Sequence, residues 1–272
     1  MERTANGLTV SAGDNARILH DLNRAVADGE PVVLATIVAT KRSVPRRAGT
    51  KMLVFEDGSS RGTVGGGQME AKVIEAAQET LRHHKPQLVE YELVNPEEGD
   101  PGICGGSLTL YLEPYMPPHN VYVIGCGHVG RAVVDLAHWL GYRTVAIDDR
   151  PDLVTEESIP NADVRFAGSV AAALDAHPVS ADTSIVVVTR SPEVDIRILP
   201  SLLETPARYV GVMGSRKRWR STRDQLLADG VPAEQLERLH VPIGIEINAE
   251  TLEEIAVSIL SEVVKVNRTE DL

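Results

Sequence analysis

The stretch Val121-Tyr122-Val123-Ile124-Gly125-Cys126-Gly127-His128-Val129-Gly130 decides the fold of the second half of the chain. Residues 121–124 predict a buried strand, and residues 128–140 predict a helix. The glycines between them have the Gly-x-Gly-x-x-Gly spacing of a dinucleotide-binding loop. In such a loop Gly125 permits the tight turn, Gly127 lets the backbone approach a phosphate, and Gly130 lets helix and strand pack closely.

The start of this helix is a candidate anion site, because the first N–H groups of a helix have no partner within it. His128 lies there and is a candidate cofactor contact. Asp148 ends the next predicted strand, about 20 residues on, where an acid can accept hydrogen bonds from ribose hydroxyls. Asp149, the next residue, is the alternative acid for this contact. Arg150 could instead meet a phosphate, so the choice between NAD and NADP stays open.

Strands and helices alternate beyond residue 120, which predicts a Rossmann-like, doubly wound parallel sheet. The predicted strands after the first are 144–147, 164–167, 184–189 and 208–213. The predicted helices after the first are 170–176, 196–203, 216–229 and 250–266.

The N-terminal part has a different pattern, which predicts an α+β domain. Helices are expected at 14–28 and 69–83, and strands at 32–40, 51–55, 87–94 and 107–113. A length of 272 residues corresponds to about two domains. Because prolines 114, 117 and 118 interrupt the pattern, we expect the domains to be 1–116 and 117–272.

Two glycine-rich segments of the first domain are candidate ligand loops. Gly65-Gly66-Gly67 precedes a predicted helix, where successive N–H groups can wrap an anion. Glu70 lies in the first turn of that helix and could cap it or contact a ligand, and the cap is slightly favoured. Cys104, beside Gly105, is either an exposed reactive thiol near Arg46, Arg47 and Arg61 or a small buried hydrophobe.

The composition excludes several classes of protein. With 39 acidic and 27 basic residues, the net charge of −12 argues against a general binder of nucleic acid or anionic membranes. The polar N-terminus and the lack of any apolar run near ~18 residues predict a soluble, cytoplasmic protein. The 2 cysteines exclude a disulfide scaffold and an all-cysteine zinc site.

Several strings, in a fixed order along nearly the whole chain, resemble the XdhC/CoxI family, the accessory factors of xanthine dehydrogenase and related molybdenum hydroxylases. They are Ala35–Val38, Ser43–Met52, Gly62–Gly67 with Glu70, Cys104-Gly105-Gly106, Gly125–Gly130, Asp148-Asp149-Arg150, Gly211–Lys217 and Pro242-Ile243-Gly244.

The resemblance implies a chaperone for the molybdenum cofactor (molybdopterin) rather than a turnover enzyme. Such a protein shields the cofactor during sulfuration, with a cysteine desulfurase as a candidate partner, and inserts it into an apo molybdenum hydroxylase of the xanthine dehydrogenase type. A homodimer is a further expectation on general grounds.

The resemblance also implies a set of cofactor-binding residues. The pterin phosphate would suit the Gly65–Gly67 loop with Arg46 and Arg47, and Cys104 is a candidate thiolate contact to molybdenum. In the second domain the candidate contacts extend to Gly214, Ser215 and Arg216.

This chain departs from the family pattern at two places. Gln68 stands where many relatives carry a cysteine after the triple glycine, and Thr189-Arg190-Ser191-Pro192 replaces a Thr-His-Asp-His-like string. Both departures bear on sulfuration.

Two other classes of function remain as alternatives. One is an NAD(P)-dependent oxidoreductase, although no proton-relay constellation stands out in the sequence. The other is a regulatory nucleotide-binding protein. A Rossmann domain that has lost its nucleotide is the purely structural interpretation.

Overall fold

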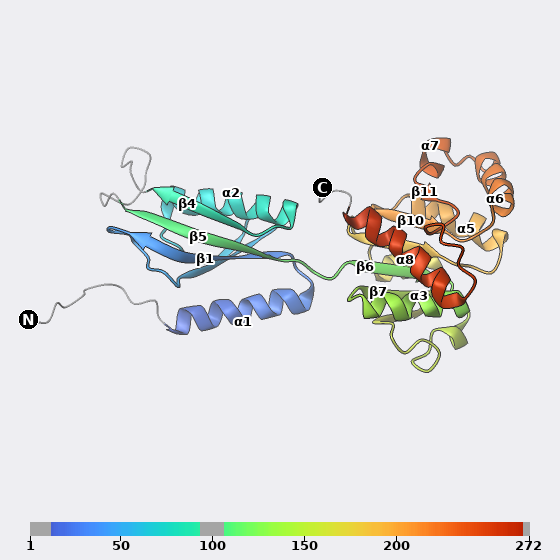
Figure 1. Ribbon diagram of the computed structural model, residues 1–272, viewed down its shortest axis with the longest axis horizontal. Coiled ribbons are helices and arrows are strands. Elements are labelled where there is room, and N and C mark those ends of the chain that lie inside the picture. The colour runs from blue at the N-terminus through green and yellow to red at the C-terminus, as the bar shows by residue number, and fades with distance from the viewer. Residues whose placement is uncertain (1–11, 93–105, 269–272) are drawn as a thin grey trace, which may run out of the picture. The chain divides into compact units, whose positions relative to one another are not determined.

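The computed structural model describes residues 12–92 and 106–268 (Figure 1). The chain divides into two compact units, Met1–Pro117 and Pro118–Leu272, and each is described by itself. Within the described residues no helix is long and apolar enough to cross a membrane.

The first unit is built on an antiparallel sheet of 5 strands in the order β3-β2-β1-β5-β4. The strands are β1 (Val32–Lys41), β2 (Lys51–Phe55), β3 (Ser60–Gly62), β4 (Gln87–Glu92) and β5 (Ser107–Tyr115). Two helices complete the unit, α1 (Ala12–Asp28) and α2 (Gly67–His83). The predicted α+β class is confirmed.

The two helices cover opposite faces of this sheet, as Figure 1 shows. From α1, Ile18 and Leu22 pack with Val32 and Leu34 of β1. On the other face α2 packs against the alternate residues of β1, such as Val33. Because β1 is buried on both faces, its sequence is a continuous apolar and β-branched run rather than an alternating one.

The second unit is built on a parallel sheet of 6 strands in the order β11-β10-β9-β6-β7-β8. The strands are β6 (Asn120–Ile124), β7 (Arg143–Asp148), β8 (Val164–Ala167), β9 (Thr183–Val187), β10 (Tyr209–Val212) and β11 (Leu239–His240). Numbered along the unit and read from β8, this is the 3-2-1-4-5-6 order of dinucleotide-binding sheets. The predicted doubly wound fold is confirmed.

Helices cover both faces of the parallel sheet (Figure 1). They are α3 (His128–Trp139), α4 (Val170–Ala176), α5 (Pro192–Leu203), α6 (Arg216–Ala228), α7 (Ala233–Leu236) and α8 (Leu252–Arg268). The helices α3 and α8 share one apolar core with the sheet, whereas α4, α5, α6 and α7 share the other.

The structure contains short elements that the sequence pattern did not predict. These are β3, α7, β11 and a single 3₁₀ turn at Pro151–Leu153. They are too short to carry a periodic signal, and β3 and β11 exist only as edge strands paired with longer neighbours. The helix predicted from residue 196 begins at Pro192, because proline fits the first helical position and Glu193 favours the first turn.

Candidate functional site

The glycine loop between β6 and α3 has one open position. Gly125 has a φ of +102°, and a Cβ there would come within 2.6 Å of the Val188 carbonyl oxygen. At Gly130 a Cβ would overlap the carbonyl oxygen of Gly125. At Gly127, by contrast, a Cβ would meet nothing within 4 Å. The packing of the chain thus requires two of the glycines, and the third borders open space.

The helix α3 begins beside this open space. Gly127 is its N-cap and makes no side-chain capping bond, and His128 is exposed at the first helical position. The first turn of α3 contains no acidic residue, so its positive dipole end is not neutralised by its own side chains. The arrangement fits the predicted anion site, and binding there stays a prediction.

Asp148 ends β7 and is buried, with 4% of its surface exposed. Its Oδ2 accepts hydrogen bonds from the backbone N–H of Cys126 at 2.7 Å and from Nη2 of Arg150 at 2.9 Å. Its Oδ1 accepts from the backbone N–H of Arg150 at 3.0 Å and from Nε at 2.8 Å. These bonds use the roughly four acceptor positions of a carboxylate, so a ribose hydroxyl would have to displace one of them.

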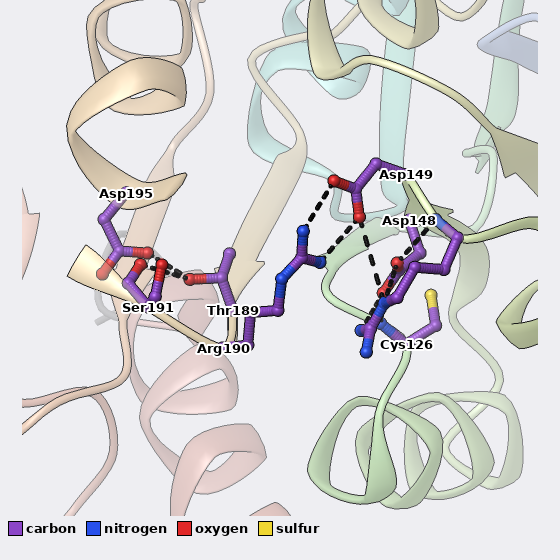
Figure 2. A network of polar contacts seen from close by, with 8 residues as sticks. Cys126, Asp148, Asp149, Thr189, Arg190, Ser191 and Asp195 are labelled. Carbon is purple, nitrogen blue, oxygen red and sulfur yellow. Dashed lines mark hydrogen bonds and ion pairs between the residues drawn. The ribbon is translucent and has the colours of Figure 1, made fainter. Parts of the chain in front are cut away.

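Asp149 forms a second ion pair with Arg190, at the carboxyl end of β9 (Figure 2). Two bonds join the guanidinium to the carboxylate, at 2.7 and 2.9 Å. They lower the pKa of Asp149 to about 2. Both side chains are nearly half exposed, at 48% and 46%, so solvent screens the pair and it contributes little to stability.

Cys126 lies in the apolar core under α3 and α8 and is 5% exposed. Burial, together with the nearby Asp148 carboxylate, raises the pKa of this thiol to about 12. Because only the thiolate is a good nucleophile and metal ligand, Cys126 acts as a small hydrophobe at neutral pH.

The unusual string after β9 forms a buried polar cluster. Thr189 donates a hydrogen bond to Asp195 of α5, and Arg218 of α6 pairs with the same carboxylate at 2.6 Å. Asp195 is 2% exposed. The cluster joins the loop after β9 to α5 and α6, so Thr189 and Asp195 fix the position of this loop.

Residues 214–216 lie at the start of α6, whose first helical residue is Arg216. The Oγ of Ser215 accepts a hydrogen bond from the backbone N–H of Arg218, which is an N-cap contact. A Cβ at Gly214 would come within 3.2 Å of the Arg218 side chain, and Arg216 is exposed. Their predicted role in cofactor binding stays a prediction.

A pocket of about 430 Å³ lies at the carboxyl ends of β6, β7, β8 and β9. Gly125, Asp148, Asp149 and Arg150 line its side toward the glycine loop. The predicted nucleotide residues Gly125 and Asp148 are thus brought together at one cavity. Gly127, His128 and Gly130 are not among its lining residues.

The α4 and α5 side of this pocket was not predicted from the sequence. Arg190, Arg197 and Ser201 line it, but none was a candidate. Arg190 follows directly after a predicted strand, and ligands of parallel sheets bind at the carboxyl ends of strands. That rule could have identified Arg190. The position of Arg197 beside the pocket has no signature in the sequence.

In the first unit, the Gly65–Gly67 loop is filled by a side chain of the protein itself. Oε1 of Glu70 accepts hydrogen bonds from the backbone N–H groups of Val64 at 3.2 Å, Gly65 at 3.3 Å and Gly66 at 2.8 Å, and from the Thr63 hydroxyl. Glu70 therefore caps α2, as the favoured interpretation held. An added anion at these N–H groups would compete with it.

The basic loop before β2 lies beside this glycine loop. A Cβ at Gly65 would come within 3.0 Å of Pro45, the residue before Arg46 and Arg47. Within residues 12–92 and 106–268, neither arginine side chain has a hydrogen bond or ion pair. Both are thus available to an anion. Arg61, in contrast, pairs with Asp21 at 3.2 Å and stacks over Phe55.

Cys104 and Gly105 lie outside the described residues. Gly106, directly after them, packs against the same basic loop, because a Cβ there would overlap the carbonyl oxygen of Ser43. No group of three or more His, Cys, Asp or Glu side chains in the described part of the chain is placed to hold a metal ion. A molybdenum contact by Cys104 stays a prediction.

The chain is similar in sequence to two proteins of Escherichia coli K12. The chain is 35% identical over 239 residues to the uncharacterized protein YqeB of Escherichia coli K12, which is 87% of this chain and 43% of YqeB. It is 24% identical over 295 residues to the molybdenum cofactor insertion chaperone PaoD of the same organism, covering 95% of this chain and 91% of PaoD.

Two further proteins resemble this chain, one in sequence and one in fold. The chain is 25% identical over 159 residues to a probable xanthine dehydrogenase subunit of Bacillus subtilis 168, covering 58% of this chain and 46% of that protein. It thus spans less than half the length of YqeB and of the Bacillus subtilis protein. A crystal structure of a xanthine dehydrogenase from Bacillus halodurans matches in fold, with a TM-score of 0.51 and 24% identity over 92% of this chain and 95% of that chain.

Two family models match the chain in order. The model described as the XdhC and CoxI family matches residues 25–92, in the α+β unit. The model described as the XdhC Rossmann domain matches residues 121–263, which is more than half of the chain. The protein is therefore a member of the XdhC and CoxI family.

Proposed function

We propose that this protein is an accessory factor that binds the molybdenum cofactor, protects it, supports its sulfuration and inserts it into an apo-hydroxylase of the xanthine dehydrogenase type. The observation that carries the proposal is the similarity to PaoD, a molybdenum cofactor insertion chaperone, along 95% of this chain and 91% of PaoD. Both units of the chain are included in that alignment, so the relation is not limited to a shared Rossmann fold.

The first unit supplies residues that fit an anionic cargo. The pterin cofactor carries a phosphate, and the guanidinium groups of Arg46 and Arg47 have no partner among the described residues. A guanidinium can bind phosphate through two parallel hydrogen bonds. In this proposal Arg46 and Arg47 take the phosphate, while Glu70 holds the neighbouring glycine loop in shape.

The sulfur-related steps of the proposal depend on a cysteine thiolate. Cys126 is buried with a raised pKa, so a thiolate role falls to Cys104 alone. A cysteine desulfurase as sulfur donor, the apo-hydroxylase as recipient and a homodimer belong to the same proposal.

The test is transfer of isolated cofactor to a recipient enzyme. The purified chain is mixed with anaerobically released molybdopterin, separated from free cofactor by gel filtration, and added to apo xanthine dehydrogenase. We expect the chain to retain pterin, measured by fluorescence after oxidation, and to raise the recovered hydroxylase activity. A chain that retains no pterin and leaves the recovery unchanged would contradict the proposal.

A variant with Arg46→Ala and Arg47→Ala tests the phosphate contact. Loss of charge-assisted hydrogen bonds worth about 1.5–3 kcal/mol each corresponds to at least a tenfold weaker binding of the pterin. Arg82→Ala is the matched control, because Arg82 is an exposed arginine at the other end of α2. Equal affinities of both variants would remove Arg46 and Arg47 from the site.

A further inference from the structure

The helix α6 is basic, although the chain as a whole is acidic. Its 13 residues, Arg216–Ala228, include five basic side chains and one carboxylate, whereas the net charge of the chain is −12. The helix lies at the outside of the second unit (Figure 1). Positive charge is therefore concentrated locally, on an element that is in a position to meet another molecule.

The inner face of α6 is fixed to the rest of the unit. Arg218 pairs with the buried Asp195 of α5 at 2.6 Å, and Ser215 caps the helix through the backbone N–H of Arg218. Thr222 and Leu226 are buried, and Leu226 belongs to the apolar core that α4, α5, α6 and α7 share. These contacts hold the helix in one position, so its outer side chains form a surface with a fixed spacing.

The remaining basic side chains lie on the outer face. Arg216, Arg220 and Arg223 follow one another at intervals of four and three residues, which places them in a row along one side of the helix. Lys217 lies beside this arginine row, three positions before Arg220. Arg223 is half-buried and the other three are exposed. None of the four side chains has a hydrogen bond or ion pair with any residue in 12–92 or 106–268.

The arginine row is unfavourable for the isolated helix. Like charges four positions apart repel each other, as Arg216 and Arg220 do here. The first turn of α6 contains no acidic residue, so Arg216 and Lys217 stand at the positive end of the helix dipole, where cations destabilise a helix. Anionic groups supplied from outside would offset both effects.

The spacing of the arginine row indicates the shape of its partner. From Arg216 to Arg223 the row extends about 10 Å along the helix axis. Carboxylates at positions i, i+3 and i+7 of an antiparallel helix repeat the same intervals in reverse order. A long polyanion or a charged membrane fits less well, because the net charge of −12 would repel it outside the row.

From this geometry we propose that the outer face of α6 is a docking surface for an acidic helix of a partner protein. Arg216, Arg220 and Arg223 pair with carboxylates on one side of that helix, and Lys217 extends the positive surface. The contact gives register and charge selectivity, since exposed ion pairs contribute more to specificity than to affinity. It does not depend on the accessory role proposed above, and each can fail without the other.

Fluorescence anisotropy with a synthetic helix tests the class of partner. The probe is a fluorescein-labelled, alanine-rich peptide of about 20 residues with glutamate at i, i+3 and i+7, titrated with the full chain at low salt. A peptide with glutamine at these positions and an oligothymidylate of equal charge are separate arms. We expect the glutamate peptide to bind at least tenfold more tightly than either, and to weaken as salt rises. If the glutamine peptide or the oligonucleotide binds equally tightly, the proposal is overturned.

A charge reversal in the middle of the row tests the surface. Arg220→Glu replaces an attraction with a repulsion and should weaken the binding of the glutamate peptide at least threefold. Arg131→Glu is the matched control, because Arg131 is an exposed arginine of α3 in the same unit and its reversal changes the net charge equally. Equal losses in the two variants would show that net charge binds the peptide, which overturns the proposal. Sedimentation of both is a further check, since self-association abolished by Arg220→Glu alone would assign the face to a second copy instead.

Stability and binding should change in opposite directions at the start of the row. Arg216→Glu places an acid in the first turn of α6, so we expect its melting temperature to rise by about 1–4 °C while the affinity for the glutamate peptide falls at least threefold. The measurements are thermal unfolding by circular dichroism and the same anisotropy titration. A lower melting temperature would overturn the argument that the row opposes folding, and an unchanged affinity would remove Arg216 from the surface.

Discussion

At the residue scale, neighbouring acidic residues have different roles because their surroundings differ. Asp148 is buried and holds the backbone of the glycine loop, whereas Asp149 is nearly half exposed and pairs with arginine side chains. In the Gly65–Gly67 loop, predicted to wrap an anion, the carboxylate of Glu70 occupies that position from within the chain. A carboxylate in a ligand-binding motif can thus be a structural group that the fold requires.

Cys126 allows a direct test of burial. We expect its thiol to resist alkylation by iodoacetamide at pH 8 in the native chain, because its pKa is raised to about 12 and its side chain lies in the core. The measurement is mass mapping of the peptide that contains Cys126 after a timed reaction. The same reaction in urea is the control, since the unfolded thiol has an ordinary pKa of about 8.5. Equal rates in both states would contradict the buried position.

At the scale of an element, the glycine loop between β6 and α3 lets the two elements pack closely and leaves the start of α3 accessible. Gly125 and Gly130 let β6 and α3 meet closely, and Gly127 leaves the start of α3 uncovered. The fold therefore requires Gly125 and Gly130, whereas Gly127 would be needed only for binding a ligand. This explains how a chain could keep two of the glycines whether or not it binds a nucleotide.

A pair of alanine variants separates these roles. Gly130→Ala places a Cβ on the Gly125 carbonyl oxygen, and overpacking of this kind costs about 1–3 kcal/mol. We expect its melting temperature to fall by about 3–10 °C. Gly127→Ala meets open space at a φ of −70°, so its cost should stay below about 1 kcal/mol. The measurement is thermal unfolding by circular dichroism. A larger loss in Gly127→Ala than in Gly130→Ala would contradict the packing described.

At the scale of the whole molecule, each unit has the parts of an independent domain. The four apolar clusters all lie within one unit or the other, and so does each sheet. The predicted domains, 1–116 and 117–272, stay a prediction about folding behaviour.

Expression of residues 118–272 alone tests that prediction. We expect the fragment to unfold in one cooperative thermal transition, because its sheet is covered by its own helices on both faces. The measurement is circular dichroism with a calorimetric scan. The fragment with Gly130→Ala is the control and should melt at a lower temperature. A fragment without a cooperative transition would mean that the second unit needs the first.

The family strings carried the strongest information in the sequence. The order of the motifs from Ala35 to Gly244 predicted the XdhC and CoxI family, and the family models confirm it. Strand and helix positions were also predictable, because periodicity and glycine spacing are local properties of the chain. Short edge strands such as β3 and β11 were not, since they are stabilised by a neighbouring strand rather than by their own residues.

The fold class, the glycine turn and the family of this protein could be read from its sequence alone. Which polar groups are already paired depends on the folded chain. Asp149 meets Arg190 across 41 positions, Asp148 meets the backbone of Cys126 across 22, and Arg197 is left with no partner among the described residues. The physical reason is that a hydrogen bond acts over about 3 Å in space, and its partners come from separate strands that only the folded sheet brings together.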